Sequence, residues 1–397
     1  MVRLYLKKGR EDSILRFHPW IFSGAIARFA GSPAEGDVVN VYSSDGVFLA
    51  TGHFQIGSIA VRILSFNEIP INQEYWNSMI AEAFAVRRSV GLVGSSDTTC
   101  YRLVHGEGDS LPGLIIDYYD GVCVIQAHSA GMFRAKTQIC EALKDVYGES
   151  LKAVYDKSSG TAPFKAGLEL VDGYIYKAEG FSENERTVSE YGHKFIVNWT
   201  EGQKTGFFLD QRENRRLVGK YAQGRRVLNL FCYTGGFSIY ALAAGAESVD
   251  SVDSSQKAID MVERNVALNG FGANRHTSYC CDAIDFLKNA PENKYDLIVV
   301  DPPAFAKHRG VLKNALRAYQ RLNATAISKV AHGGLVFTYS CSQVVDKEAF
   351  ALAVFSAAAS VGRSVRILDR LNQAPDHAVN IYHPEGEYLK GLLLYVE

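Results

Sequence analysis

The chain has 397 residues, which exceeds the usual size of one hydrophobic core, so we expect two or three domains. Its composition, 47% hydrophobic and 21% charged, is typical of a globular protein, and its apolar runs are too short for a membrane span or a signal peptide. A net charge of −1 gives no overall signal for nucleic-acid binding, so any RNA contact needs a local basic patch. Seven cysteines without C-x-x-C spacing argue against a disulfide framework or a zinc site. We therefore expect a cytoplasmic protein with no membrane partner and no metal.

The first 72 residues are predicted to form a small β-barrel. Short alternating runs at Val38–Tyr42, Phe48–Thr51 and Ala60–Leu64 are separated by turn residues, which is typical of closely spaced strands. The segment 67–72 contains a proline and reads as a linker to the next domain.

Residues 1–30 combine basic and aromatic side chains. Basic groups neutralise phosphates and aromatic faces stack on bases, so this stretch is a candidate RNA contact. In the other interpretation, Trp20 and Phe22 are core residues and the charges only keep the domain soluble. The residues by themselves favour this second interpretation. The candidate RNA-contact residues are Lys8, Arg10, Arg16, His18 and Trp20.

Residues 73–185 read as a mixed α+β domain, with an amphipathic helix at Tyr75–Val90 and strands at Ile115–Tyr119 and Val122–His128. Over residues 186–397 strands alternate with helices, which predicts a doubly wound α/β sheet. The predicted strands are Arg226–Phe231, Ser248–Asp253, Arg275–Cys280, Tyr295–Val300, Gly334–Thr338, Ser364–Asp369 and Leu389–Val396. The predicted helices are Gly236–Ala244, Ser255–Leu268, Ala283–Asn289, Arg317–Val330 and Lys347–Ser360.

A cofactor pocket is predicted where the first strands of this sheet end. The first strand runs into a turn containing Gly235 and Gly236, which let the backbone approach a ligand closely. Asp253 closes the second strand and can accept from ribose hydroxyls, and Asp282 follows the third and can accept from an adenine amino group. The turn lacks the spaced glycines of G-x-G-x-x-G, so adenosine with a non-phosphate tail, such as S-adenosylmethionine, fits better than a dinucleotide. In a plainer interpretation, both aspartates only cap helices.

The fourth and fifth strands are followed by Asp301-Pro302-Pro303 and by Ser340-Cys341-Ser342. If the two strands are neighbours, a carboxylate and a thiol share one crevice. C5 of cytosine is a poor nucleophile until a thiolate adds to C6 and N3 is protonated. Cys341 can supply the thiolate, and Asp301 can protonate N3 if its pKa is raised. The alternative is that Cys341 is an ordinary buried thiol.

Side chains near the Asp-Pro-Pro loop are predicted to contact RNA. Phe305 offers a face on which an extruded base can stack. Lys307, His308 and Arg309 can hold phosphates and favour the thiolate form of the cysteine. Cys232, inside the first turn, is expected to be a packing residue. The sequence does not identify the base that removes the C5 proton.

Together these residues closely resemble the family of rRNA large subunit methyltransferase I, which are S-adenosylmethionine-dependent 23S rRNA cytosine-C5 methyltransferases. The resemblance covers nearly the whole chain. Its markers are Gly9-Arg10, His18-Pro19-Trp20-Ile21-Phe22-Ser23-Gly24, Gly106-Glu107-Gly108-Asp109, Leu111-Pro112-Gly113-Leu114, Lys204-Thr205-Gly206-Phe207-Phe208-Leu209-Asp210-Gln211-Arg212, Phe231-Cys232-Tyr233-Thr234-Gly235-Gly236-Phe237, Asp301-Pro302-Pro303-Ala304-Phe305, Ser340-Cys341-Ser342 and Pro384-Glu385-Gly386-Glu387-Tyr388-Leu389-Lys390-Gly391.

The resemblance implies a PUA RNA-binding domain (1–72), a central α+β domain (73–185) and a class I methyltransferase domain (186–397). It favours the RNA interpretation of the N-terminal patch and implies that Gly206–Arg212 closes over the cofactor. Asn229 stands where many class I methyltransferases have an acidic residue, and the Asp-Pro-Pro loop has no second cysteine. The cofactor-binding residues predicted in this way are Asp210, Gln211, Arg212, Asn229, Phe231, Tyr233, Thr234, Gly235, Gly236, Asp253, Asp282 and Asp301.

The predicted activity is thus methylation of cytosine C5 in 23S rRNA or a large-subunit precursor, with S-adenosylhomocysteine as the product. Two alternatives stay open: methylation of an rRNA guanine without a nucleophile, and a non-catalytic RNA-binding or ribosome-assembly factor. The sequence also leaves a homodimer open.

Overall fold

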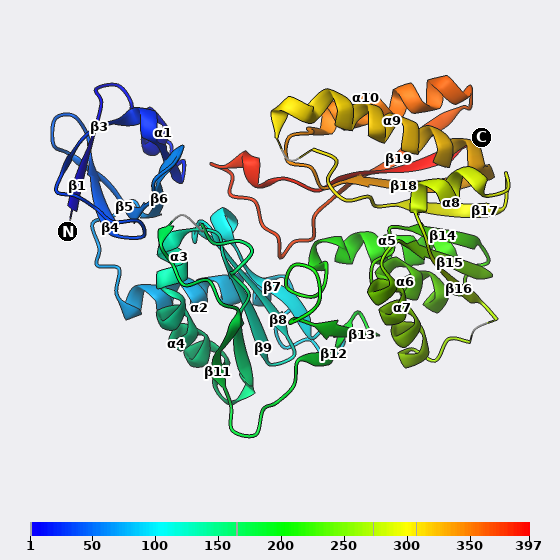
Figure 1. The fold of residues 1–397 in the computed structure, drawn as a ribbon, viewed down its shortest axis with the longest axis horizontal. Coiled ribbons are helices and arrows are strands. Elements are labelled where there is room, and N and C mark those ends of the chain that lie inside the picture. Colours follow the sequence, from blue (N-terminus) through cyan, green and yellow to red (C-terminus); the bar gives the residue numbers. More distant parts are fainter. Residues whose placement is uncertain (1, 164–165, 273, 307) are drawn as a thin grey trace. The chain divides into compact units, whose positions relative to one another are not determined.

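The computed structural model describes residues 2–397 with the exception of 164–165, 273 and 307 (Figure 1). The chain forms two compact units. The first comprises Met1–Val188, Val197–Phe207 and Pro375–Gly386, and the second comprises Ser189–Ile196, Phe208–Ala374 and Glu387–Glu397. In the described residues, no helix has the length and apolar character needed to cross a membrane.

The first unit begins with the small β domain predicted from the sequence. Its sheet has six strands in the order β2-β6-β5-β4-β1-β3. Apolar side chains that alternate along these strands, such as Val39, Val41 and Val61, form its core. The elements are β1 (Val2–Leu6), α1 (Asp12–Leu15), β2 (Trp20–Phe22), β3 (Ile26–Ala30), β4 (Val38–Tyr42), β5 (Phe48–Phe54) and β6 (Ile59–Ser65).

The first unit continues with a five-stranded sheet in the order β11-β10-β9-β8-β7, of which only the β9–β10 pair among those described is parallel. The predicted helix at 75–90 is confirmed, and it starts earlier because Asn72 caps it by accepting from the Tyr75 N–H. The elements are α2 (Gln73–Ser89), β7 (Cys100–His105), β8 (Leu114–Tyr119), β9 (Val122–Ala127), α3 (Ala130–Arg134), α4 (Lys136–Tyr147), β10 (Ala153–Asp156) and β11 (Gly173–Lys177).

A later segment of the chain, Pro375–Gly386, also belongs to the first unit. Arg87 donates to the Asp376 carbonyl at 2.7 Å, and the Asp376 carboxylate accepts from the Arg102 backbone N–H at 2.9 Å. The short 3₁₀ helix η7 (Pro384–Gly386) ends this segment. Another short pair, β12 (Glu185–Glu190) with β13 (His193–Asn198), lies where the chain passes between the units.

The second unit is built on a seven-stranded sheet in the order β16-β15-β14-β17-β18-β20-β19. The first five of these strands pair in parallel, and β20 runs antiparallel between β18 and β19. The doubly wound α/β prediction is therefore confirmed. The strands are β14 (Arg226–Leu230), β15 (Ser248–Asp253), β16 (His276–Cys280), β17 (Tyr295–Val300), β18 (Val330–Ser340), β19 (Val365–Asn372) and β20 (Lys390–Val396).

Helices cover both faces of this sheet. Figure 1 shows α5, α6 and α7 on one face and α8, α9 and α10 on the other. The strand order reverses between β14 and β17, which is the position where open α/β sheets form a ligand crevice at their carboxyl ends. The helices are α5 (Arg212–Ala222), α6 (Gly236–Ala243), α7 (Gln256–Leu268), α8 (Ala283–Asn289), α9 (Leu312–Lys329) and α10 (Lys347–Val361). The domain boundaries predicted at residues 72 and 185 stay predictions.

Candidate active site

The turn after β14 adopts a backbone shape that needs glycine. Phe231, Tyr233 and Gly235 all have positive φ angles, of 57°, 47° and 81°. A Cβ on Gly235 would lie 3.2 Å from a methyl carbon of Val262, so a side chain there would meet both strain and a close neighbour. The Gly235 N–H donates to the Cys232 carbonyl at 2.8 Å, and α6 begins at the next residue. At the end of β14 the turn therefore presents backbone atoms that no side chain of Gly235 covers.

Asp253 closes β15 and fixes this turn. One carboxylate oxygen accepts from the Tyr233 N–H at 3.0 Å and the other from the Ser255 N–H at 2.9 Å. Ser255 is the N-cap residue of α7, and Asp253 supports the start of this helix through the Ser255 N–H. Each carboxylate oxygen has a further lone pair, so a contact with ribose hydroxyls stays a prediction.

Asp282 is the N-cap residue of α8. Its Oδ1 accepts from the N–H groups of Ile284 and Asp285, both at 2.9 Å, and the side chain is exposed. A groove of about 530 Å³ runs along α8 and includes Asp282, but it contains none of the residues of the β14 turn. The capping interpretation is confirmed, and a contact with adenine stays a prediction.

Three buried polar atoms of the second unit, from β14, the turn after it and the segment before α5, fit the amino-acid end of S-adenosylmethionine. Asn229 Oδ1, Thr234 Oγ1 and Asp210 Oδ1 are buried and find no hydrogen-bond partner among the described residues. The Asn229 amide donates its N–H to Ser238 Oγ at 2.8 Å, which leaves its oxygen as the acceptor. A ligand ammonium group is a donor of the kind these atoms lack, because buried acceptors are normally satisfied.

The segment that precedes α5 connects this site to Asp301. Gln211 Nε2 donates to Asp301 Oδ2 at 3.0 Å, and Asn214 Nδ2 donates to Gln211 Oε1 at 2.6 Å. Asp210 Oδ2 accepts from the Tyr388 hydroxyl at 2.6 Å. Gln211 therefore holds a predicted catalytic residue, a role that the sequence did not indicate.

Arg212 was predicted to bind the cofactor, and it is fully buried. Its Nε lies 3.6 Å from a Glu190 carboxylate oxygen. Arg215 donates to the same carboxylate at 2.7 Å and also to the Phe208 carbonyl at 2.7 Å. These contacts hold the start of α5 in place, and a contact between Arg212 and the cofactor stays a prediction.

Asp301 directly follows β17, and its surroundings shift the pKa of its carboxyl group. Burial, and after it the charge of Asp210, raises the pKa of Asp301 to about 7. The hydrogen bond from Gln211 and the charge of Arg215 act in the opposite direction. A pKa near neutrality is what a general acid needs at physiological pH, so the condition set by the sequence for Asp301 is met.

Cys341 follows the neighbouring strand. β17 and β18 pair in parallel, with Val300 opposite Thr338, so Asp301 and Cys341 leave the same edge of the sheet. Burial, and then the charges of Asp301 and Asp210, raises the pKa of the Cys341 thiol to about 11. Lys390 acts in the opposite direction.

The cation that favours the Cys341 thiolate therefore differs from those predicted. Lys390 is buried, and burial lowers its own pKa to about 8. His308 and Arg309, which were expected to favour the thiolate, are exposed, and Lys307 lies outside the described residues. Lys390 sits far along the chain from Cys341, so no local motif pointed to it.

Three hydrogen bonds fix the loop that carries Cys341. Lys390 Nζ donates to the carbonyls of Ser342 and Val345, both at 2.6 Å. Ser342 Oγ donates to the Ala306 carbonyl at 2.5 Å, which ties this loop to the Asp-Pro-Pro loop. The structure therefore holds the carboxyl and the thiol on two loops that are fastened to each other.

Two other side chains near these loops are packed. Phe305 is half-buried, with its ring 4.7 Å from that of Tyr319, so stacking on a flipped base stays a prediction. Cys232 is buried, and burial raises the pKa of its thiol well above its usual value. That environment fits the packing role predicted for Cys232.

The candidate RNA-contact residues of the N-terminal stretch lie in the first unit. Lys8, Arg10 and Arg16 are exposed, whereas His18 and Trp20 are half-buried. The Trp20 indole N–H donates to Glu107 Oε1 at 2.8 Å. Phe22 is 50% exposed, so the interpretation that places it in the core is wrong. Successive side chains of β2 point to opposite faces of the sheet, so Ile21 is buried in the core while Phe22 points outward.

Comparison with known proteins identifies both domains and the family. A model of a PUA-like domain matches residues 4–66, and one of an S-adenosylmethionine-dependent methyltransferase matches residues 173–392. A protein of Aeromonas hydrophila named Ribosomal RNA large subunit methyltransferase I is 41% identical over 397 residues, which cover 98% of each chain. A protein of the same name from Vibrio vulnificus is 38% identical over 98% of each chain. The chain belongs to this family.

Membership of the ribosomal RNA large subunit methyltransferase I family makes the chain an S-adenosylmethionine-dependent rRNA methyltransferase. A solved structure described as a SAM-dependent methyltransferase from Streptococcus mutans has a TM-score of 0.84 at 24% identity, with full coverage of both chains. Another solved methyltransferase, complexed with SAH, has a TM-score of 0.85 at 24% identity. At this identity the two structures confirm the fold, and the family confirms the predicted resemblance and cofactor.

Proposed function

We propose that the protein methylates C5 of a cytosine in 23S rRNA, with Cys341 as the nucleophile and Asp301 as the acid that protonates N3. The observation that supports this most is the placement of the two groups. They follow neighbouring parallel strands, and the charge of Asp301 acts on the Cys341 thiol. Addition of a thiolate to C6 and protonation of N3 need a nucleophile and an acid on one base.

The reactive form of the Asp301–Cys341 pair is the one that holds a single proton. The Asp301 pKa is about 7 and the Cys341 pKa about 11, so between these two pH values the pair carries one negative charge, mainly on the carboxylate. Moving the remaining proton from sulfur to the carboxyl leaves that charge unchanged. It produces a thiolate next to a carboxylic acid, which is the combination that the addition step requires.

In the proposed reaction a bond forms between Cys341 Sγ and C6 of cytosine while Asp301 gives its proton to N3. This places electron density on C5. S-adenosylmethionine, when bound, supplies the electrophilic methyl group that C5 takes up. A base then removes the C5 proton, the electron pair restores the C5–C6 double bond, and the Sγ–C6 bond breaks. The Asp301 carboxylate takes the N3 proton back.

The first test replaces the nucleophile. Cys341→Ala is expected to abolish methyl transfer from radiolabelled S-adenosylmethionine to 23S rRNA and to leave cofactor binding unchanged. Cys280→Ala, which removes an exposed thiol on β16, is the matched control and is expected to keep full activity. A Cys341→Ala enzyme with full activity would contradict the mechanism.

A trapping experiment tests the covalent step directly. In RNA containing 5-fluorocytidine the C5 substituent cannot leave as a proton, so the Sγ–C6 bond persists. Wild-type protein is expected to form a complex with this RNA that survives denaturation, and Cys341→Ala is expected to form none. Peptide mass mapping would then place the RNA adduct on residue 341.

The raised pKa of Cys341 favours a second candidate, methylation of another rRNA base without a nucleophile. Mass spectrometry of nucleosides from the modified rRNA separates the two. 5-Methylcytidine supports the lead proposal, and a methylguanosine that Cys341→Ala still produces supports the other. RNA binding without any modified nucleoside would favour an assembly factor.

A further inference from the structure

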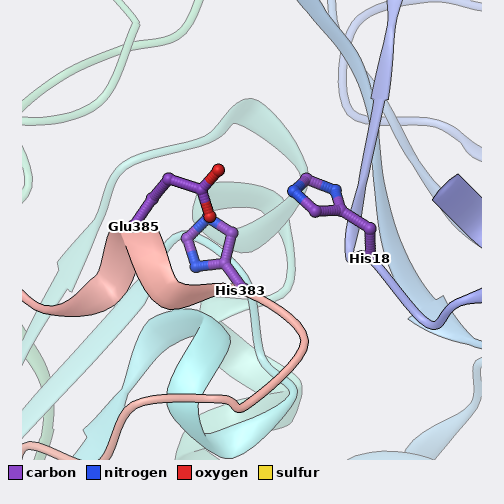
Figure 2. Close-up of side chains that lie close together, drawn as sticks. All are labelled: His18, His383 and Glu385. Carbon is purple, nitrogen blue, oxygen red and sulfur yellow. The ribbon is translucent and has the colours of Figure 1, made fainter.

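We propose that the first unit binds one divalent transition-metal ion, with zinc the best match, between His18, His383 and Glu385. Each residue offers one ligand atom, and the three atoms lie within 4.8 Å of one another. Figure 2 shows the His383 ring and the Glu385 carboxylate, both from the Pro375–Gly386 segment, facing the His18 ring of the N-terminal β domain. All three residues belong to the first unit, whereas Asp301 and Cys341 belong to the second.

His383 carries the strongest indication of a ligand. Only 3% of its surface is exposed, and neither ring nitrogen finds a hydrogen-bond partner in the part of the chain that the structure describes. Buried polar groups normally have hydrogen-bond partners, so a buried imidazole whose two nitrogens lack them needs an explanation. A metal ion bound to one nitrogen would supply it. Its Nε2 lies 3.9 Å from Glu385 Oε2, which is too far for a hydrogen bond.

The ligand atoms lie up to 4.8 Å apart, so they must move closer together when an ion binds. Bonds of about 2.0–2.2 Å from tetrahedral zinc place two ligand atoms roughly 3.3–3.5 Å apart. The 3.9 Å separation of His383 Nε2 and Glu385 Oε2 is slightly larger. The Glu385 side chain is 58% exposed, so it can turn toward the imidazole without disturbing packed neighbours.

His18 is oriented by the backbone of a neighbouring residue. The Trp20 N–H donates to His18 Nδ1 at 3.2 Å, and the same nitrogen lies 3.3 Å from the Trp20 carbonyl oxygen. In the metal-bound form the proton would move to Nδ1, so that the ring donates to the carbonyl and Nε2 presents a lone pair. Histidines that bind metals commonly donate their other N–H to a backbone carbonyl or a carboxylate in this way.

The ligand set indicates the class of ion. Two imidazoles and a carboxylate suit zinc with a fourth position for water, whereas calcium and magnesium prefer oxygen ligands. The cluster contains no cysteine, which disfavours copper(I) and iron–sulfur centres. Trp20 packs its ring 4.3 Å from that of His383 and shields the site on one side. The ion would join the N-terminal β domain to Pro375–Gly386.

Titration calorimetry with zinc tests the site. The full-length protein is treated with a chelator, exchanged into chelator-free buffer and titrated with zinc chloride. We expect one ion per chain, with the affinity reduced at least about tenfold by His18→Gln, His383→Gln or Glu385→Gln. His332→Gln, which changes an exposed histidine of the second unit, is the control and should bind as wild type does. Wild-type protein that binds no zinc, or a His18→Gln/His383→Gln variant that binds it equally well, overturns the proposal.

Cobalt(II) gives a second readout that identifies the ligands. The substituted protein should show visible bands of a four- or five-coordinate ion without a sulfur-to-cobalt charge-transfer band, and cobalt should quench Trp20 fluorescence. A sulfur band would place the ion on an exposed thiol such as Cys280 or Cys281 and overturn the assignment. Circular dichroism checks the fold of each variant. Glu385→Gln alters an exposed side chain, so it keeps the test decisive if a histidine variant unfolds.

Discussion

Asp301 and Cys341 are linked electrostatically because the charge of Asp301 acts on the Cys341 thiol. The Asp301 carboxylate helps to raise the pKa of Cys341 to about 11, and burial with the charge of Asp210 raises that of Asp301 to about 7. A lone thiol with so high a pKa is a weak nucleophile at neutral pH. Protonation of Asp301 removes this repulsion, so it lowers the pKa of the thiol. The same protonation supplies the acid that the reaction needs. Burial of the thiol and its repulsion by Asp301 are therefore compatible with the proposed reaction.

The pH dependence of the rate tests this coupling. The reactive form of the pair holds one proton, so below the Asp301 pKa of about 7 both groups are protonated and the rate should fall. The logarithm of kcat/KM is expected to rise with pH up to about 7 and then to level off, because the second proton leaves only near pH 11. Initial rates between about pH 5.5 and 8.5 measure it. A flat profile over that range would show that Asp301 does not titrate in the free enzyme.

Two variants should move the rising limb of that profile in opposite directions. Gln211→Leu removes a hydrogen bond that lowers the Asp301 pKa, so the limb should shift to higher pH. Asp210→Asn removes a charge that raises it, so the limb should shift to lower pH. Both changes can also weaken cofactor binding, but only the position of the limb reports on Asp301. Shifts of the same sign in both variants would contradict the assignment.

At the scale of elements, the site depends on loops that the sheet brings together and side chains then fasten. β18 extends to Ser340, beyond its predicted end, because Ser340 pairs with Lys390 of the antiparallel strand β20. The same lysine then binds the carbonyls of Ser342 and Val345 beneath the cysteine loop. The Asp-Pro-Pro loop is tied in by the hydrogen bond from Ser342 to Ala306.

Gly235→Ala tests the element on the cofactor side. Its φ of 81° and the 3.2 Å approach to Val262 predict a loss of stability of about 1–2 kcal/mol together with weaker cofactor binding. Gly245→Ala is a matched control, because Gly245 has a φ of 85° but no neighbour closer than 4.0 Å. It should lose stability through backbone strain and keep its affinity for S-adenosylmethionine. Urea unfolding and calorimetry measure the two quantities, and equal cofactor affinity in both variants would contradict the role of the turn.

At the scale of the whole molecule, positive and negative charges nearly cancel, and only local patches carry a net charge. The net charge of −1 leaves RNA binding to patches such as the exposed basic residues Lys8, Arg10 and Arg16. Phosphate contacts of this kind weaken as salt rises, because each contact releases condensed counterions. The proposed RNA role of the N-terminal domain therefore predicts a salt dependence that its basic residues control.

A double variant tests that role. Lys8→Ala/Arg10→Ala should weaken rRNA binding and reduce the slope of log K against log salt by about 1–2, as expected for two lost phosphate contacts. Methyl transfer at saturating RNA should stay near the wild-type rate. Lys220→Ala/Lys288→Ala removes two exposed charges from helices of the second unit and is the control. Equal salt slopes for both double variants would place the RNA contact elsewhere.

The sequence by itself determined the parallel sheet, its helices and the two loops that hold Asp301 and Cys341. The spacing of apolar residues and the position of turn residues are local signals. Strands such as Ser248–Asp253 and Tyr295–Val300 were therefore predicted with their observed bounds. Only the tertiary structure decided which distant groups act on these loops. Burial and charge depend on neighbours far along the chain, so the role of Lys390, the bond from Gln211 to Asp301 and the His18–His383–Glu385 cluster carry no local motif. The residue types were readable from the chain, and their pKa values and partners came from packing.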